Sequence, residues 1–145
     1  MFKATKEIYD AVTGMGLKAN IVEVDGCSMV CVQYPLEYSA PIDIRFMSTD
    51  DDNDVAVRVD LMRVQEKDVD IVLPLINAFN VKKRYVKFTL GKLNDINVEY
   101  DMPLSGDQVG ECAKEMIGLF MLAIHKVHPQ LLHALVREES EDTAC

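Results

Sequence analysis

The chain has 145 residues, of which 49% are hydrophobic and 27% are charged, and its formal net charge is −9. This length is typical of a single domain with one hydrophobic core, and the composition excludes a chain that is disordered throughout. The negative charge argues against general binding to nucleic acid or to anionic membranes, because their phosphate groups would repel the chain.

The N-terminal segment and the cysteines both indicate an intracellular protein. Residues 1–7 lack the apolar core of a signal peptide, and the longest apolar run, 116–124, is shorter than the roughly 20 residues of a membrane-spanning helix. No two of the cysteines form a C-x-x-C pair: they are Cys27, Cys31, Cys112 and Cys145. We therefore expect a cytoplasmic protein whose thiols are reduced and buried.

The first half of the chain predicts one helix followed by four strands. Residues 2–15 place apolar side chains at three- and four-residue spacing, as an amphipathic helix does. Four short segments that are β-branched or alternate between apolar and polar residues follow, at 20–24, 27–33, 42–46 and 55–61. Alternation places one face on a core and the other in water, so these segments predict an antiparallel sheet.

The second half predicts a helix, two more strands and a final helix. Residues 66–79 return to helical spacing, and Pro74 within them predicts a kink or a late helix start. Alternating strands follow at 86–90 and 96–100.

The final helix has a predicted start and a predicted break. Residues 105–108, Ser-Gly-Asp-Gln, fit a capping box, from which the helix runs to about residue 127. We expect His128-Pro129 to break it, because a residue before proline avoids the helical conformation, and a short helical piece to follow at 130–136.

These segments together predict an α+β fold in the order α-β-β-β-β-α-β-β-α. An antiparallel sheet with the helices packed on one face is the economical arrangement. We expect one domain over residues 1–136 and an acidic, flexible C-terminal tail over 137–145.

One segment carries a family resemblance. Residues 75–80 read LINAFN, with Asn77 and Asn80 three apart, and residues 85–90 read YVKFTL. This helix end followed by an alternating strand resembles the YbjN family, whose fold is similar to that of type III secretion chaperones. The resemblance implies a non-enzymatic regulator that binds another polypeptide, commonly as a homodimer, and it supplies no catalytic residue.

The two asparagines also have a physical interpretation. Asn80 stands where the helix is predicted to stop, and asparagine tolerates the left-handed conformation of a helix cap. Asn77 lies one turn earlier and could bond the backbone of a neighbouring strand. A contact with a ligand is the alternative for both.

No constellation predicts catalysis, a metal or a cofactor. The acidic run 50–54 lacks the glycine and the final glutamate of a calcium loop, so it predicts a solvated hairpin loop. His125, His128 and His133 lack the pattern of a zinc site. We expect them to be surface residues near a helix C-terminus, where the helix dipole favours them. The basic run 82–84 predicts a solvated turn, with a phosphate-binding patch as the alternative.

Charged residues on the predicted solvent face of the sheet suggest cross-strand ion pairs. Two pairs of opposite charge lie on the strands at 42–46 and 55–61, namely Asp43 with Arg58 and Arg45 with Asp60. The alternating strands leave few polar groups on the buried face, which favours binding at a surface over binding in a polar pocket.

The final helix is too apolar for one buried stripe. A first set of apolar residues makes one face: Val109, Ala113, Met116, Phe120 and Ile124. Cys112, Leu119 and Leu122 lie outside this face, and Met121 extends it. Neighbouring helices of the same chain, a second copy or a partner peptide could each cover the excess.

We therefore expect a non-enzymatic protein-binding module, a chaperone-like adaptor or regulator that acts as a homodimer. Cys112, Leu119, Met121 and Leu122 are its predicted dimer or partner interface. The partner is not identified by the sequence. The alternative is a small-molecule-binding or enzymatic domain with a pocket between sheet and helices.

Overall fold

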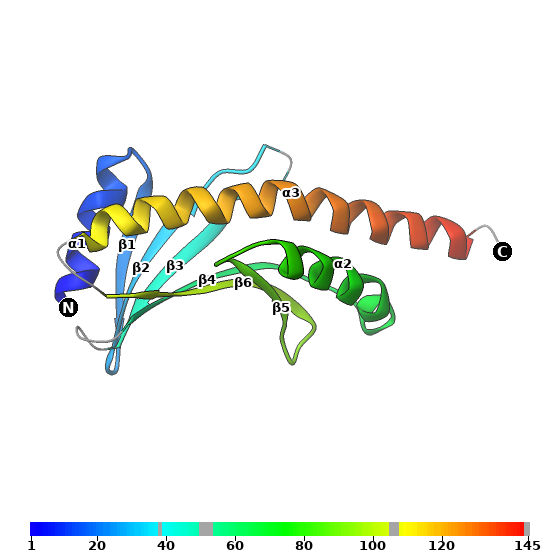
Figure 1. Cartoon of the computed structure of the whole chain (residues 1–145), viewed down its shortest axis with the longest axis horizontal. Coiled ribbons are helices and arrows are strands. Elements are labelled where there is room, and N and C mark those ends of the chain that lie inside the picture. The colour runs from blue at the N-terminus through cyan, green and yellow to red at the C-terminus, as the bar shows by residue number, and fades with distance from the viewer. Residues whose placement is uncertain (38, 50–53, 105–107, 144–145) are drawn as a thin grey trace.

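A computed structural model describes residues 1–37, 39–49, 54–104 and 108–143, the last seven of these by their helix backbone alone. Its helices and strands follow the predicted order (Figure 1): α1 Lys3–Gly14, β1 Lys18–Val24, β2 Cys27–Tyr34, β3 Ile42–Ser48, β4 Asp54–Arg63, α2 Val69–Lys82, β5 Lys87–Leu90, β6 Asp95–Pro103 and α3 Val109–Thr143. A 3₁₀ turn, η1 Glu66–Asp68, precedes α2. The predicted α+β class is thereby confirmed.

The sheet has six strands in the order β1-β2-β3-β4-β6-β5, and every neighbouring pair is antiparallel. Alternating residues form its buried side: every second residue of β3 from Ile42 onward is buried, and so are Val55, Val57 and Val59 of β4. Val59, Val98 and Phe88 face one another across three strands and are all buried. One hydrophobic core thus joins the sheet to the helices.

Helix α3 crosses the helical side of the sheet from end to end, and its C-terminal part projects beyond it (Figure 1). At its start it packs on α1 at close range. A Cβ atom on Gly110 would come within 3.0 Å of the Ala11 Cβ atom and 3.1 Å of the Glu7 carbonyl oxygen. The absent side chain therefore sets how near the two helices can lie.

The prediction that α3 breaks at His128-Pro129 is wrong, because the helix is continuous over 35 residues and includes Pro129. The proline costs the helix one amide donor, about 3 kcal/mol in an ordinary helix interior. Beyond it, however, Leu131 is fully buried and Leu135 is half-buried. Burial on the same core stabilises the turns on both sides of the proline.

Helix α2 likewise contains its proline. The 3₁₀ turn comes first and the α-helix begins at Val69, five residues before Pro74. The helix therefore does not begin at the proline, and it continues to Lys82 instead of ending near Phe79.

Three predictions concern residues at the edges of the described structure. Residues 105–107 of the predicted capping box 105–108 and most of the acidic run, 50–53, lie outside the described residues. Where α3 begins, the Cys112 amide donates to the Gln108 carbonyl oxygen at 3.0 Å. The backbone of residues 137–143 continues the helix, and the flexibility of this tail stays a prediction.

Residues 109–136 of α3 are long and apolar enough to cross a membrane, by length and composition alone. The single apolar run of the sequence did not indicate this, because polar residues interrupt it. The buried residues of this segment belong to the one core of the domain. The core helix of a water-soluble domain meets the same criterion, so the finding does not establish a membrane span.

Candidate functional site

The predicted interface residues of α3 divide between the core and the surface. Leu122 is 72% exposed and Leu119 is 38% exposed. Cys112 is half-buried against the core, and Met121 is buried in it. Met121 therefore does not contribute to an exposed surface, and the two leucines remain as the candidate site.

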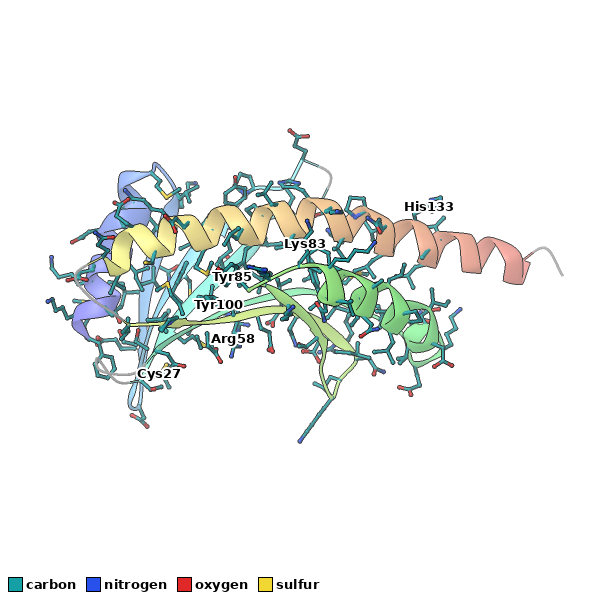
Figure 2. All side chains as sticks on the ribbon, viewed as in Figure 1. Cys27, Arg58, Lys83, Tyr85, Tyr100 and His133 are labelled. Carbon is teal, nitrogen blue, oxygen red and sulfur yellow. The ribbon has the colours of Figure 1, made fainter. Side chains whose placement is uncertain are left out.

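An open cavity of about 260 Å³ lies beside these two leucines. The end of α2, the turn into β5 and the middle of α3 form its walls. Figure 2 labels Lys83 and Tyr85 of this turn. Its apolar lining consists of Phe79, Val86, Leu119, Leu122 and Ala123. Leucine side chains at the mouth of an apolar cavity form a surface that binding to a partner would remove from water.

Three cations surround this apolar cavity. Lys83 and Arg84 come from the turn after α2, and Lys126 comes from α3. Within the part of the chain that the structure describes, no carboxylate forms an ion pair with any of them. In a chain of net charge −9, this cavity therefore combines an apolar floor with a positively charged rim. We call its eight lining residues the α2–α3 pocket.

Asn80 fixes the position of the pocket's outer wall. Its side-chain Nδ2 donates to the Phe88 carbonyl oxygen at 2.8 Å, and its Oδ1 accepts from the Phe88 amide at 2.9 Å. The amide side chain thus pairs with β5 as a neighbouring strand would. The predicted cap role of Asn80 is wrong, because the residue lies inside α2 and has no positive φ. Asn77, assigned that strand contact, is instead exposed.

Lys87 forms hydrogen bonds at the C-terminal end of α2, next to the same turn. Its Nζ donates to the carbonyl oxygens of Asn80 at 2.7 Å and Lys83 at 2.6 Å. A cation at this position satisfies carbonyl groups that a helix leaves unpaired at its C-terminus. The basic run 82–84 is exposed, as expected of a solvated turn, and Lys87 holds its backbone in place.

The turn contains a strained residue. Tyr85 has φ of 69°, and the Val86 amide donates to the Arg84 carbonyl oxygen at 2.9 Å around it. This is a classic γ-turn, which is rare because a side chain at positive φ is strained. Contact with Tyr100, with ring centroids 5.8 Å apart at 88°, supports the tyrosine. Both flanking residues line the α2–α3 pocket.

A second, more polar cavity of about 390 Å³ lies where β3 and β4 separate. Their pairing ends at Arg45 and Arg58, whereas β4 goes on pairing with β6 as far as Arg63. Asp43, Arg45, Asp60 and His128 are among its lining residues.

His128 lines this second cavity. It is only 6% exposed, so its predicted place on the surface is wrong, whereas His125 and His133 are exposed as expected. Burial lowers the pKa of the His128 imidazole, because a charge there would be poorly solvated. Among the described residues, no three His, Cys, Asp or Glu side chains gather as a metal-binding group.

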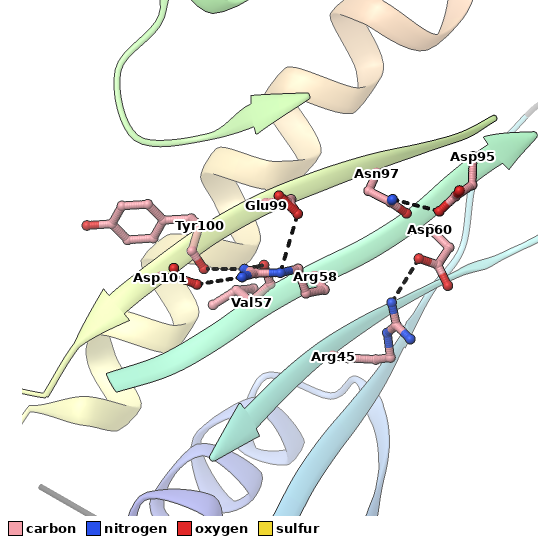
Figure 3. Close-up of polar contacts among 9 residues, drawn as sticks. All are labelled: Arg45, Val57, Arg58, Asp60, Asp95, Asn97, Glu99, Tyr100 and Asp101. Atoms are coloured by element: carbon pink, nitrogen blue, oxygen red, sulfur yellow. Dashed lines mark hydrogen bonds and ion pairs between the residues drawn. The ribbon is translucent and has the colours of Figure 1, made fainter. Parts of the chain in front are cut away.

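The solvent face of the sheet is held by ion pairs (Figure 3). Arg45 bonds Asp60 at 2.9 Å, which confirms one predicted pair. The pair Asp43–Arg58 is wrong: Arg58 contacts Asp101 at 2.7 Å and Glu99 at 3.5 Å. The register explains this, because Arg58 lies directly opposite Glu99 on β6 and opposite another arginine on β3.

Comparison with protein-family models gives one match. Residues 42–132 match the YbjN family, described as "Putative bacterial sensory transduction regulator". This chain belongs to the YbjN family. The matched range contains most of the lining of the second cavity, α2 with Asn80, the γ-turn and the α3 segment with Leu119 and Leu122. No curated protein and no solved structure matches the chain significantly.

The family description is regulatory rather than catalytic. The first part of the sequence motif that suggested this family, 75–80, precedes the γ-turn, and its second part, 85–90, begins at the central residue of that turn, Tyr85. Its second asparagine, Asn80, makes two hydrogen bonds to the backbone of Phe88. The motif thus describes how the wall of the α2–α3 pocket is built.

Proposed function

We propose that this YbjN protein is a non-enzymatic regulator or adaptor, located in the cytoplasm, that binds another polypeptide at the exposed surface of α3 and acts as a homodimer. The observation that carries the proposal is Leu122, which is 72% exposed at the mouth of the α2–α3 pocket. Removing such a side chain and the adjoining apolar wall from water stabilises a complex by about 25 cal/mol per Å² of apolar area.

The size of the pocket suits one anchoring side chain. Its volume of about 260 Å³ is below the range of roughly 300–1,000 Å³ that is usual for small-molecule sites. It is large enough to receive a leucine or phenylalanine side chain of a partner. Interfaces commonly concentrate their binding energy in a few such anchors.

The charges of the rim add a requirement for the partner. Lys83, Arg84 and Lys126 favour carboxylates close to the anchoring side chain. The strained γ-turn at Tyr85 fits this role, because strained backbone collects at sites that bind ligands. The partner is therefore expected to combine an apolar residue with acidic neighbours.

The second cavity favours a different function, the binding of a small molecule. It is larger, at about 390 Å³, and it offers Arg45, two carboxylates and His128 as polar contacts. If a small molecule binds in this cavity, Arg45→Met would abolish its binding. Substitutions in the α2–α3 pocket would leave that binding unchanged.

Site-specific photo-cross-linking in living host cells tests the proposal. A photoreactive amino acid replaces Leu122 in one variant and Leu93 in the control, since Leu93 is 68% exposed on the β5–β6 turn. We expect a discrete protein adduct at position 122 and none at 93. Adducts of equal yield at both positions, or none at position 122, would contradict binding at this surface.

A further inference from the structure

The tip of the β1–β2 hairpin carries an apolar side chain between two carboxylates. Glu23, Val24 and Asp25 are consecutive there, and all three are exposed, Val24 to 62%. Asp25 and Gly26 form the two-residue turn, and Gly26 has φ of 72°, which glycine adopts without strain. The turn therefore fixes Val24 and both acids at one corner of the sheet, in contact with water.

These are the features that the α2–α3 pocket requires of its partner. The apolar lining receives an apolar side chain, and the rim favours carboxylates beside it, through Lys83, Arg84 and Lys126. Among the exposed large apolar residues of the described structure, Val24 alone has an acidic residue on each side of it in the sequence. Leu93, by contrast, follows a lysine. Val24 is therefore the exposed apolar residue of this chain that best matches the pocket.

The charges of the tip and of the rim are available for a contact between chains. Within the part of the chain that the structure describes, Asp25 forms no ion pair, and neither do the three cations of the rim. Glu23 pairs with the amino group of Met1 at 2.9 Å, and its side chain is 54% exposed. Opposite charges on two separate surfaces draw those surfaces together and fix how they meet.

The hairpin tip cannot reach the pocket of its own chain. β1 is one edge of the six-stranded sheet and β5 is the other (Figure 1). Neighbouring strands lie about 4.8 Å apart, so these two edges are separated by roughly 24 Å. The pocket lies at the β5 edge, because its wall includes the turn from α2 into β5. A contact between the tip and the pocket therefore needs a second copy of the chain.

We propose that the polypeptide bound in the α2–α3 pocket is the β1–β2 hairpin tip of a second copy, with Val24 against Leu122 and Asp25 beside the cationic rim. The inference rests on the proposed function and names its partner. Around a two-fold axis, each copy gives its own tip and receives the tip of the other. The contact is then made twice, and the assembly closes as a dimer.

Disulfide cross-linking between two purified full-length variants tests the contact. The four native cysteines are replaced by serine in both; one variant carries Val24→Cys, and the other, which has an affinity tag, carries Leu122→Cys. Both positions are exposed, and circular dichroism checks that each variant folds. After mixing and mild oxidation we expect an adduct of one chain of each kind, at about twice the chain mass of 16.3 kDa. Tagged Leu93→Cys replaces Leu122→Cys in the control mixture, which should give little adduct.

A charge exchange in the chain with its native cysteines tests the rim. Asp25→Lys and Lys126→Glu should each raise the dissociation constant of the dimer by about tenfold or more, because each places like charges together. The double variant restores opposite charges and should return to within about threefold of wild type. Glu37→Lys, at an exposed site away from the tip and the pocket, makes the same change of net charge as Asp25→Lys and should leave the constant near the wild-type value. Sedimentation equilibrium measures all four variants.

The outcomes separate this inference from the proposed function. A mixed adduct no more abundant than with Leu93→Cys would overturn the inference, and so would a double charge exchange that dimerises no better than the single variants. If Leu122→Glu abolished the dimer while Asp25→Lys left it intact, the inference would fail and the proposed function would stand. A chain that is monomeric throughout would also overturn the inference, whereas photo-cross-linking at position 122 would still decide whether a different polypeptide binds there.

Discussion

Both sides of helix α3 carry apolar residues, but only one side is buried. Phe120, Ile124 and Leu131 on the sheet side are fully buried, whereas Leu122 and Val136 on the other side are 72% and 64% exposed. The buried side stabilises the fold, whereas the exposed side leaves apolar area in water. The comparison teaches that apolar excess on one helix can be divided between folding and binding.

The largest expected effect separates the two sides by stability. Phe120→Ala should lower the free energy of unfolding by about 3–5 kcal/mol, because it opens a cavity in the core. Val136→Ala, on the exposed side, should change it by less than about 0.5 kcal/mol in the monomer. Urea unfolding of both variants at low protein concentration checks this; equal losses would mean that the two sides do not differ.

A second prediction concerns the wall that joins the exposed side of α3 to the pocket. Asn80→Ala should cost about 2–3 kcal/mol, because it leaves the Phe88 amide and carbonyl groups without their partners. Asn77→Ala, three residues away and exposed, should be nearly neutral. If thermal unfolding showed Asn80→Ala to be as stable as wild type, the two bonds to Phe88 would contribute little to stability.

A smaller effect is expected on the solvent face of the sheet. Arg58 links β4 to β6 through Glu99 and Asp101 and is only partly exposed, so Arg58→Gln should cost about 0.5–1 kcal/mol. Lys92→Gln, on an exposed turn, serves as the matched loss of a cation. Indistinguishable unfolding midpoints for the two variants would show that the pairs on this face contribute nothing measurable.

The last prediction concerns pH and the buried part of α3. Burial holds the pKa of His128 below its unfolded value of about 6.5, so the unfolded chain takes up a proton more readily than the folded one. The stability that depends on neutral His128 is therefore complete above that value and is lost as the pH falls below it. His128→Gln should unfold with a weaker dependence on pH between 7.5 and 5.5 than wild type.

The fold could be predicted because its signals are local. Alternation in residues such as Val55, Val57 and Val59 marks the buried face of a strand wherever the strand lies. The break at Pro129 was wrongly predicted because a local rule about proline was outweighed by burial of Leu131 on a distant sheet. No single segment of the sequence predicts the strand order that places the sheet against this helix.

The site was only partly predictable for the same reason. The excess of apolar residues in α3 identified Leu119 and Leu122, but it also selected Met121. Adjacent residues point to different sides of a helix, so Met121 is buried whereas Leu122 is exposed. The rim could not be predicted, because Lys83 and Arg84 meet Lys126 only through a γ-turn at a non-glycine residue. The two asparagines drew attention to the correct segment, although their roles depended on where Phe88 lies in space.

The molar mass in solution tests the central claim, that the exposed side of α3 binds a second copy, most directly. Light scattering behind a sizing column, over a dilution series, compares wild type with Leu122→Glu and with Leu93→Glu as the control at another exposed leucine. We predict that wild type and Leu93→Glu have twice the chain mass of 16.3 kDa at high concentration, and that Leu122→Glu is monomeric throughout. A wild-type monomer at every concentration, or a Leu122→Glu variant that dimerises as well as wild type, would contradict the account.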